Sequence, residues 1–170
     1  PVPPLQVASQ AILRANGWAS IPPLSPERVN AIKTHLGSLT ATPSENRYGH
    51  YATKDLLACP EIFDILTDPA LLATMSDYLE APCTISVVTA WWSHPTTEPP
   101  SGNQQWHHDR GDFRSCNLFV YLTDVTEETG PHAYVPGSHD SAAIDRRGGF
   151  VSDGADFWVW FDHDHRKRDC

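Results

Sequence analysis

The chain has 170 residues and a formal net charge of −9, and 40% of its residues are hydrophobic. The length is that of one domain, and the composition is too apolar for a disordered chain. No basic stripe accompanies the acidic balance, and no apolar run approaches the roughly 18 residues that span a bilayer. We therefore expect one domain over residues 1–170 that binds neither nucleic acid nor membrane.

The cysteines and the N-terminus bear on the cellular setting. Four cysteines occur without a C-x-x-C pair, which excludes a zinc ribbon and requires no disulfide framework. The first ten residues lack a charged stretch followed by an apolar one, so no signal peptide is expected. A reducing, cytoplasmic setting is therefore expected.

The first 82 residues are predicted to be mainly helical. A first helix ends at Asn16-Gly17, a second begins after Ser25 with proline at its first position, and a third begins at Asp68 and ends near Pro82. The apolar stripes that support these helices are Leu5, Ala8, Ile12 and Leu13; Val29, Ile32, Leu36 and Leu39; and Leu71, Leu72, Met75 and Leu79. These helices are expected to cover another layer and to carry no chemistry.

From residue 83 the pattern changes to β-branched and aromatic runs with turns between them. Short strands after a helical start indicate a mainly β sandwich or jelly roll with helices packed outside. The predicted strands are residues 83–92, 106–109, 117–124, 133–135 and 157–161.

One pattern of metal-binding type lies in the second of these strands. His107 and Asp109 are two residues apart, so on a strand their side chains point to the same side. An imidazole and a carboxylate are two of the three ligands of a facial triad, which suits Fe(II) because it leaves coordination positions open. With nine histidines in the chain, one such pair is expected by chance, and an exposed histidine beside a turn carboxylate is the alternative.

A third ligand must come from a distant part of the chain. His163 and His165 follow the predicted strand at 157–161 and are also two residues apart. Either could complete a triad, and a polar C-terminal tail is the alternative interpretation.

The stretch from Gln105 to His139 is more specific than either pattern. It contains W-H-x-D, then a strand ending in L-T-D-V, an acidic turn into G-P, and V-P-G-S-H. In order and spacing these elements resemble the phytanoyl-CoA dioxygenase family of Fe(II)/2-oxoglutarate oxygenases. A weaker match is Gly17-Trp18 followed by the helix at Ser25.

The resemblance implies a double-stranded β-helix, that is, a cupin-like jelly roll, over residues 83–170 behind a helical cover of residues 1–82. It implies that His107, Asp109 and a distal histidine hold the iron, with His165 preferred and His163 as the alternative. It gives His139 a structural role at a turn. His108, on the opposite face, contacts the co-substrate or is simply packed.

The family also carries an arginine about ten residues beyond the distal histidine, which binds the far carboxylate of 2-oxoglutarate. Counted from His165, that position falls beyond Cys170, so the C-terminus is expected to be short. Arg110 and Arg114 are candidate substitutes because a guanidinium binds a carboxylate through two parallel hydrogen bonds; surface charges beside a loop are the alternative. Asn117 is a candidate hydrogen-bond partner of the organic acid.

The activity implied is hydroxylation of a C–H bond of a small molecule, using O₂ and 2-oxoglutarate and releasing succinate and CO₂. Two other classes stay open. One is a metal- or ligand-binding jelly roll that lacks the 2-oxoglutarate-binding arginine and has no turnover. The other is a zinc hydrolase, since the same donors suit zinc. The substrate and the oligomeric state do not follow from the sequence.

Overall fold

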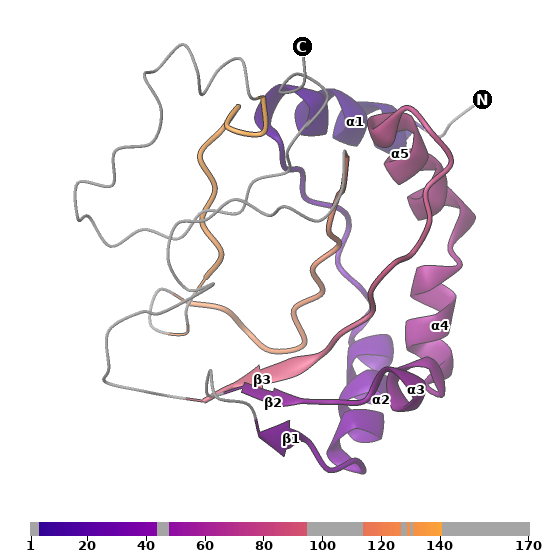
Figure 1. The fold of residues 1–170 in the computed structure, drawn as a ribbon, viewed down its shortest axis with the longest axis vertical. Coiled ribbons are helices and arrows are strands. Elements are labelled where there is room, and N and C mark those ends of the chain that lie inside the picture. Colours follow the sequence, from indigo (N-terminus) through magenta and orange to yellow (C-terminus); the bar gives the residue numbers. More distant parts are fainter. Residues whose placement is uncertain (1–3, 44–47, 95–113, 127–128, 130, 141–170) are drawn as a thin grey trace.

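The computed structural model describes residues 4–43, 48–94, 114–126, 129 and 131–140, with side chains from Gln10 onward. Its helices form an arc along one side of the molecule, in which the last described helix lies next to the first. Residues 114–126 and 131–140 lie on the inner side of this arc (Figure 1). The helices are α1 (Pro4–Asn16), α2 (Pro26–Gly37), α3 (Thr53–Leu57), α4 (Pro60–Leu66) and α5 (Pro69–Leu79), and the strands are β1 (Thr42–Pro43), β2 (Tyr48–His50) and β3 (Trp91–Ser93).

The three predicted helices are confirmed as α1, α2 and α5, and local hydrogen bonds explain their boundaries. Ser25 Oγ accepts the Arg28 N–H at 3.4 Å at the start of α2. At the start of α5, Asp68 Oδ1 accepts two backbone N–H groups, each at 2.9 Å. Gly17 ends α1 with a φ of +81°, a left-handed conformation that glycine adopts without steric cost.

Helices α3 and α4 were not predicted. Both are short, and neither has a side-chain cap at its N-terminus. Proline at the first position of α4, Pro60, is the one sequence signal that could have indicated it.

Among the described residues, the buried core lies within the helical layer. Ile32 and Leu36 of α2 and Leu56 of α3 are buried with Cys59, which precedes α4. Leu122, from the inner side of the arc, packs against this group together with partly buried side chains of the helical layer and of residues 88–90. In α1 the predicted apolar stripe is not fully covered, because Ile12 is exposed.

The described strands form one antiparallel sheet in the order β1-β2-β3, with Thr42 opposite His50 and Tyr48 opposite Ser93. The predicted strand at 83–92 is wrong over most of its length, since only its last two residues belong to β3. Before β3 this segment bonds to a side chain and to a loop: Cys83 N–H donates to Ser76 Oγ, and the Ala90 carbonyl accepts Tyr51 N–H.

The predicted strands at 117–124 and 133–135 are also wrong, because neither segment carries strand structure. Their residue types favour extended backbone, but a strand also needs a neighbour to complete a hydrogen-bond ladder. The predicted strands at 106–109 and 157–161 lie outside the described residues, so the jelly roll stays an expectation. None of the described helices has the length and apolar character needed to cross a membrane.

Candidate functional site

Most of the predicted site falls outside the part of the chain that the structure describes. This applies to the predicted iron ligands His107, Asp109 and His165, with the alternative His163, and also to His108 and Arg110. Among the described residues no three His, Cys, Asp or Glu side chains form a group that could hold a metal. The predicted iron ligands therefore stay predictions.

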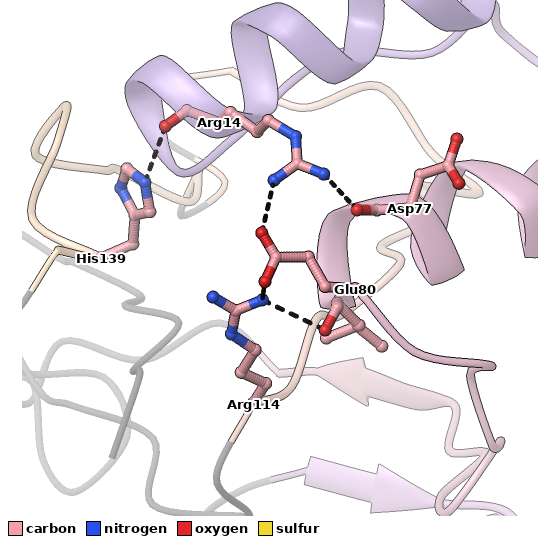
Figure 2. A network of polar contacts seen from close by, with 6 residues as sticks. Arg14, Asp77, Glu80, Arg114 and His139 are labelled. Atoms are coloured by element: carbon pink, nitrogen blue, oxygen red, sulfur yellow. Dashed lines mark hydrogen bonds and ion pairs between the residues drawn. The ribbon is translucent and has the colours of Figure 1, made fainter. Parts of the chain in front are cut away.

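Arg114 is described, and it lies at the C-terminal end of α5 (Figure 2). Its Nη1 is 2.8 Å from Glu80 Oε2 and donates to the Leu79 carbonyl at 3.1 Å. The side chain is 26% exposed, so this contact is partly shielded from water. Three residues further on, Asn117 is exposed.

Glu80 joins Arg114 to α1. Its other carboxylate oxygen, Oε1, lies 3.4 Å from Arg14 Nη1, and Arg14 Nη2 donates to the Asp77 carbonyl. The Glu80 backbone has a φ of +57° at the end of α5, and its side chain lies between the two arginines in Figure 2. We call Arg14, Asp77, Glu80 and Arg114 the Glu80 cluster.

The charges of the Glu80 cluster favour the ionised carboxylate. Arg114 lowers the pKa of Glu80 below its ordinary value of 4.5, first by its hydrogen bond and then by its charge, and Arg14 adds a smaller effect of the same sign. Both arginines also donate to carbonyl groups near the C-terminus of α5, where positive charge is favourable. The cluster thus joins α1, α5 and the segment that follows the W-H-x-D motif.

The V-P-G-S-H turn contacts the C-terminal end of the same helix α1. Gly137 N–H donates to the Asn16 carbonyl at 2.9 Å, and His139 Nε2 lies 3.0 Å from the Arg14 carbonyl. Since a carbonyl only accepts, Nε2 carries the proton. These bonds satisfy two of the carbonyls that a helix leaves open at its C-terminus. They agree with the structural role expected of His139.

The His139 ring lies directly against Gly17. A methyl group on Gly17 would be 2.5 Å from His139 Nδ1, a buried atom with no hydrogen-bond partner in the described part of the chain. Gly17-Trp18 and the V-P-G-S-H turn, which are separate motifs in the sequence, are therefore in contact.

Aromatic residues join the two segments of the inner side. Tyr121 OH bonds His132 Nδ1, and the ring of Phe119 lies 4.4 Å from that of His132. Tyr134 stacks on Trp18 at 6.1 Å, and burial raises the pKa of Tyr134 to about 12. Phe119 and Tyr121 are two residues apart, as are His132 and Tyr134. On extended backbone this spacing places two side chains on one side, so it is a sequence signal that could have identified these aromatic contacts.

A cavity of about 280 Å³ lies between α3, α4 and residues 85–88. Its lining is apolar or carries only hydroxyl groups, so it offers no acid, base or metal ligand for catalysis. The lining residues are Thr53, Leu57, Phe63, Leu66, Thr67, Ile85, Ser86, Val87 and Val88.

The comparisons with known proteins bear on the family. The model of the phytanoyl-CoA dioxygenase (PhyH) family matches residues 13–169, which include the W-H-x-D and V-P-G-S-H motifs. No curated protein matches the chain, and no solved structure matches it. Members of this family are in general oxygenases with a cupin-like fold that use Fe(II) and 2-oxoglutarate. Because the match spans most of the sequence, the chain belongs to the phytanoyl-CoA dioxygenase family.

Proposed function

We propose that this protein is a non-haem Fe(II), 2-oxoglutarate-dependent oxygenase that hydroxylates a C–H bond of a small molecule. The observation that carries the proposal is the family match over residues 13–169, because it includes the H-x-D pair and both histidine candidates for the distal ligand.

The donor set fits the metal. Two imidazoles and one carboxylate, from His107, Asp109 and His165, are the ligands of a facial triad that favours Fe(II) and keeps positions open. When bound, Fe(II) and 2-oxoglutarate supply the oxidising chemistry: one atom of O₂ enters the C–H bond as a hydroxyl group, and the other enters succinate as CO₂ leaves. The protein's own residues bind and orient the reactants.

For the far carboxylate of 2-oxoglutarate we favour Arg110 over Arg114. The Arg114 guanidinium is already bound to Glu80 and to the Leu79 carbonyl, and using it for the co-substrate would break the Glu80 cluster. Asn117 is exposed and stays a candidate hydrogen-bond donor to the organic acid, and His108 a candidate co-substrate contact.

We also propose a cytoplasmic setting. It rests on the cysteine pattern of the sequence, whose spacing requires no disulfide framework.

The test of turnover is the release of succinate. We expect the full chain, loaded with Fe(II) and supplied with 2-oxoglutarate and O₂, to release succinate and CO₂ slowly by itself and faster with a substrate. Asp109→Ala removes a proposed ligand and should abolish the release. The matched control is Asp64→Ala, which removes an exposed carboxylate from α4 and should leave the release unchanged.

Other results would point to the other two classes. Binding of metal and 2-oxoglutarate without succinate release would indicate a binding domain. Zinc-dependent hydrolysis that needs neither O₂ nor 2-oxoglutarate would indicate a hydrolase. Either result would overturn the proposed oxygenase.

A further inference from the structure

Arg114 lies close in the chain to the proposed iron ligands. It follows Asp109 by five residues, and five residues of fully extended chain span at most about 18 Å. Whatever fixes the position of Arg114 therefore limits where Asp109 can lie.

Two polar contacts hold the Arg114 side chain. Its guanidinium bonds both the Glu80 carboxylate, at 2.8 Å, and the Leu79 carbonyl, at 3.1 Å. Glu80 is itself held from the other side by Arg14, and its backbone N–H bonds the Ser76 carbonyl. Both of these contacts of Arg114 thus lead into the helical layer, which contains the core.

The chemistry of the Glu80 cluster favours a permanent contact. An arginine that donates to a carboxylate and to a helix C-terminal carbonyl uses two favourable interactions at once. A co-substrate that comes and goes with each turnover would have to displace both. The arrangement suits a residue that holds the chain in place better than one that binds 2-oxoglutarate.

We propose that Arg114 and Glu80 form a positioning pair that attaches the segment carrying His107 and Asp109 to the end of α5. Arg114 acts on the metal through the backbone that leads to Asp109, and it does not touch 2-oxoglutarate. This inference rests on the proposed function, because it assigns the pair a role toward the iron ligands of that site.

The test compares metal affinity with co-substrate affinity in the full chain. The variants are Glu80→Gln, which keeps the shape of the side chain and removes its charge, Arg114→Gln, which removes the guanidinium, and their combination. Asp64→Asn removes a carboxylate from the exposed face of α4 and serves as the control. Fe(II) and Mn(II) affinities are measured anaerobically by titration, and 2-oxoglutarate affinity is measured at saturating metal.

We expect each Gln variant to weaken Fe(II) binding by about tenfold, as is found when a group that orients a metal ligand is removed. The double variant should bind Fe(II) no more weakly than either single variant, because each single substitution already removes the same ion pair. The affinity for 2-oxoglutarate at saturating metal should not change. Arg114→Lys keeps the charge and should recover most of the Fe(II) affinity, a rescue that loss of folding would not show.

Three results would overturn the inference. If the variants bind Fe(II) as the wild type does, Arg114 and Glu80 form only a surface pair. If Arg114→Gln loses 2-oxoglutarate affinity while Glu80→Gln keeps both affinities, Arg114 binds the co-substrate. If the wild type binds no Fe(II), the proposed function fails together with the inference. In the first two results the wild type still binds Fe(II), so only the positioning role fails. Should Arg114→Gln fail to fold, Glu80→Gln and Arg114→Lys still decide the question.

Discussion

The helical layer and the inner segments, residues 114–126 and 131–140, are stabilised in different ways. The helical layer contains the buried apolar core around Ile32, Leu36 and Leu56. The inner segments contribute Leu122 to that core, and otherwise they are attached through polar and aromatic contacts: Arg114 to Glu80, His139 to the end of α1, and Tyr134 to Trp18. Among the described residues, therefore, the buried apolar side chains lie mostly in the helical layer, and specific polar and aromatic contacts attach the inner segments to it.

The largest effect should come from the core of the helical layer. Leu56 is 0% exposed, and Leu56→Ala should lower the free energy of unfolding by about 2–5 kcal/mol, because it removes a buried side chain and leaves a cavity. Its neighbour Leu57 is 42% exposed, so Leu57→Ala should cost much less. Urea denaturation of both variants measures the difference. Equal costs would mean that the core does not lie where the structure places it.

The junction between α1 and the V-P-G-S-H turn should show the next largest effect. Gly17→Ala places a methyl group 2.5 Å from His139 Nδ1 on a backbone with φ of +81°, and the conformation alone costs about 1–2 kcal/mol. Gly37→Ala is the matched control, since nothing lies within 4 Å of its added methyl group. Urea denaturation should show a clear loss for the first variant and none for the second.

A double-mutant cycle identifies the source of that loss. In a His139→Ala background the Gly17→Ala substitution should cost less, because the clash with the ring is gone and only the backbone conformation remains. Identical costs in both backgrounds would show that the His139 ring does not lie against Gly17.

The start of α5 offers a smaller and purely local effect. Asp68 Oδ1 accepts two backbone N–H groups, and Asp68→Ala should cost about 1 kcal/mol of stability. Asp64→Ala, on the exposed face of α4, removes the same charge without a cap and should be close to neutral. Thermal unfolding compares the two. A neutral Asp68→Ala would show that the cap is not formed in solution.

The smallest effect concerns the Glu80 cluster and depends on pH. Since the pKa of Glu80 is lowered in the folded chain, its ion pairs stabilise the fold above the ordinary pKa of 4.5 and lose that contribution as the pH falls through the lowered value. The wild type should therefore unfold at a slightly higher temperature than Glu80→Gln near pH 7, and the difference should vanish at strongly acidic pH.

Salt provides the control for that measurement. The Glu80 side chain is 53% exposed, so NaCl at about 1 M should screen its ion pairs and shrink the difference near neutral pH. A difference that grows as the pH falls would contradict the assignment of the Glu80 cluster.

The two regions also differ in how far the sequence predicts them. Ser25, Asp68 and Gly17 mark helix ends through contacts within a few residues, and these boundaries were predicted correctly. A strand depends on a partner elsewhere in the chain: β3 pairs with β2, and the three residues of β2, Tyr48–His50, are too few to show an alternation of residue types in the sequence. For that reason the strands at 83–92, 117–124 and 133–135 were overpredicted.

The candidate site likewise has parts that the sequence predicts and parts that it does not. The motifs around His107, Asp109 and His139 identify the family from the sequence alone, because their order and spacing are specific. The partner of Arg114 could not be predicted, since Glu80 lies in a different element and its left-handed backbone has no sequence signal. Contacts between distant elements are set by packing, which a local pattern does not report.

The central claim is that the chain holds Fe(II) through His107, Asp109 and a distal histidine, and binds 2-oxoglutarate on that metal. The direct measurement is the weak visible charge-transfer band of Fe(II) chelated by 2-oxoglutarate, recorded anaerobically with the full chain. We predict a band in the wild type and in Asp64→Ala, and none in Asp109→Ala. A folded wild-type chain without the band, or an unchanged band in Asp109→Ala, would contradict the claim.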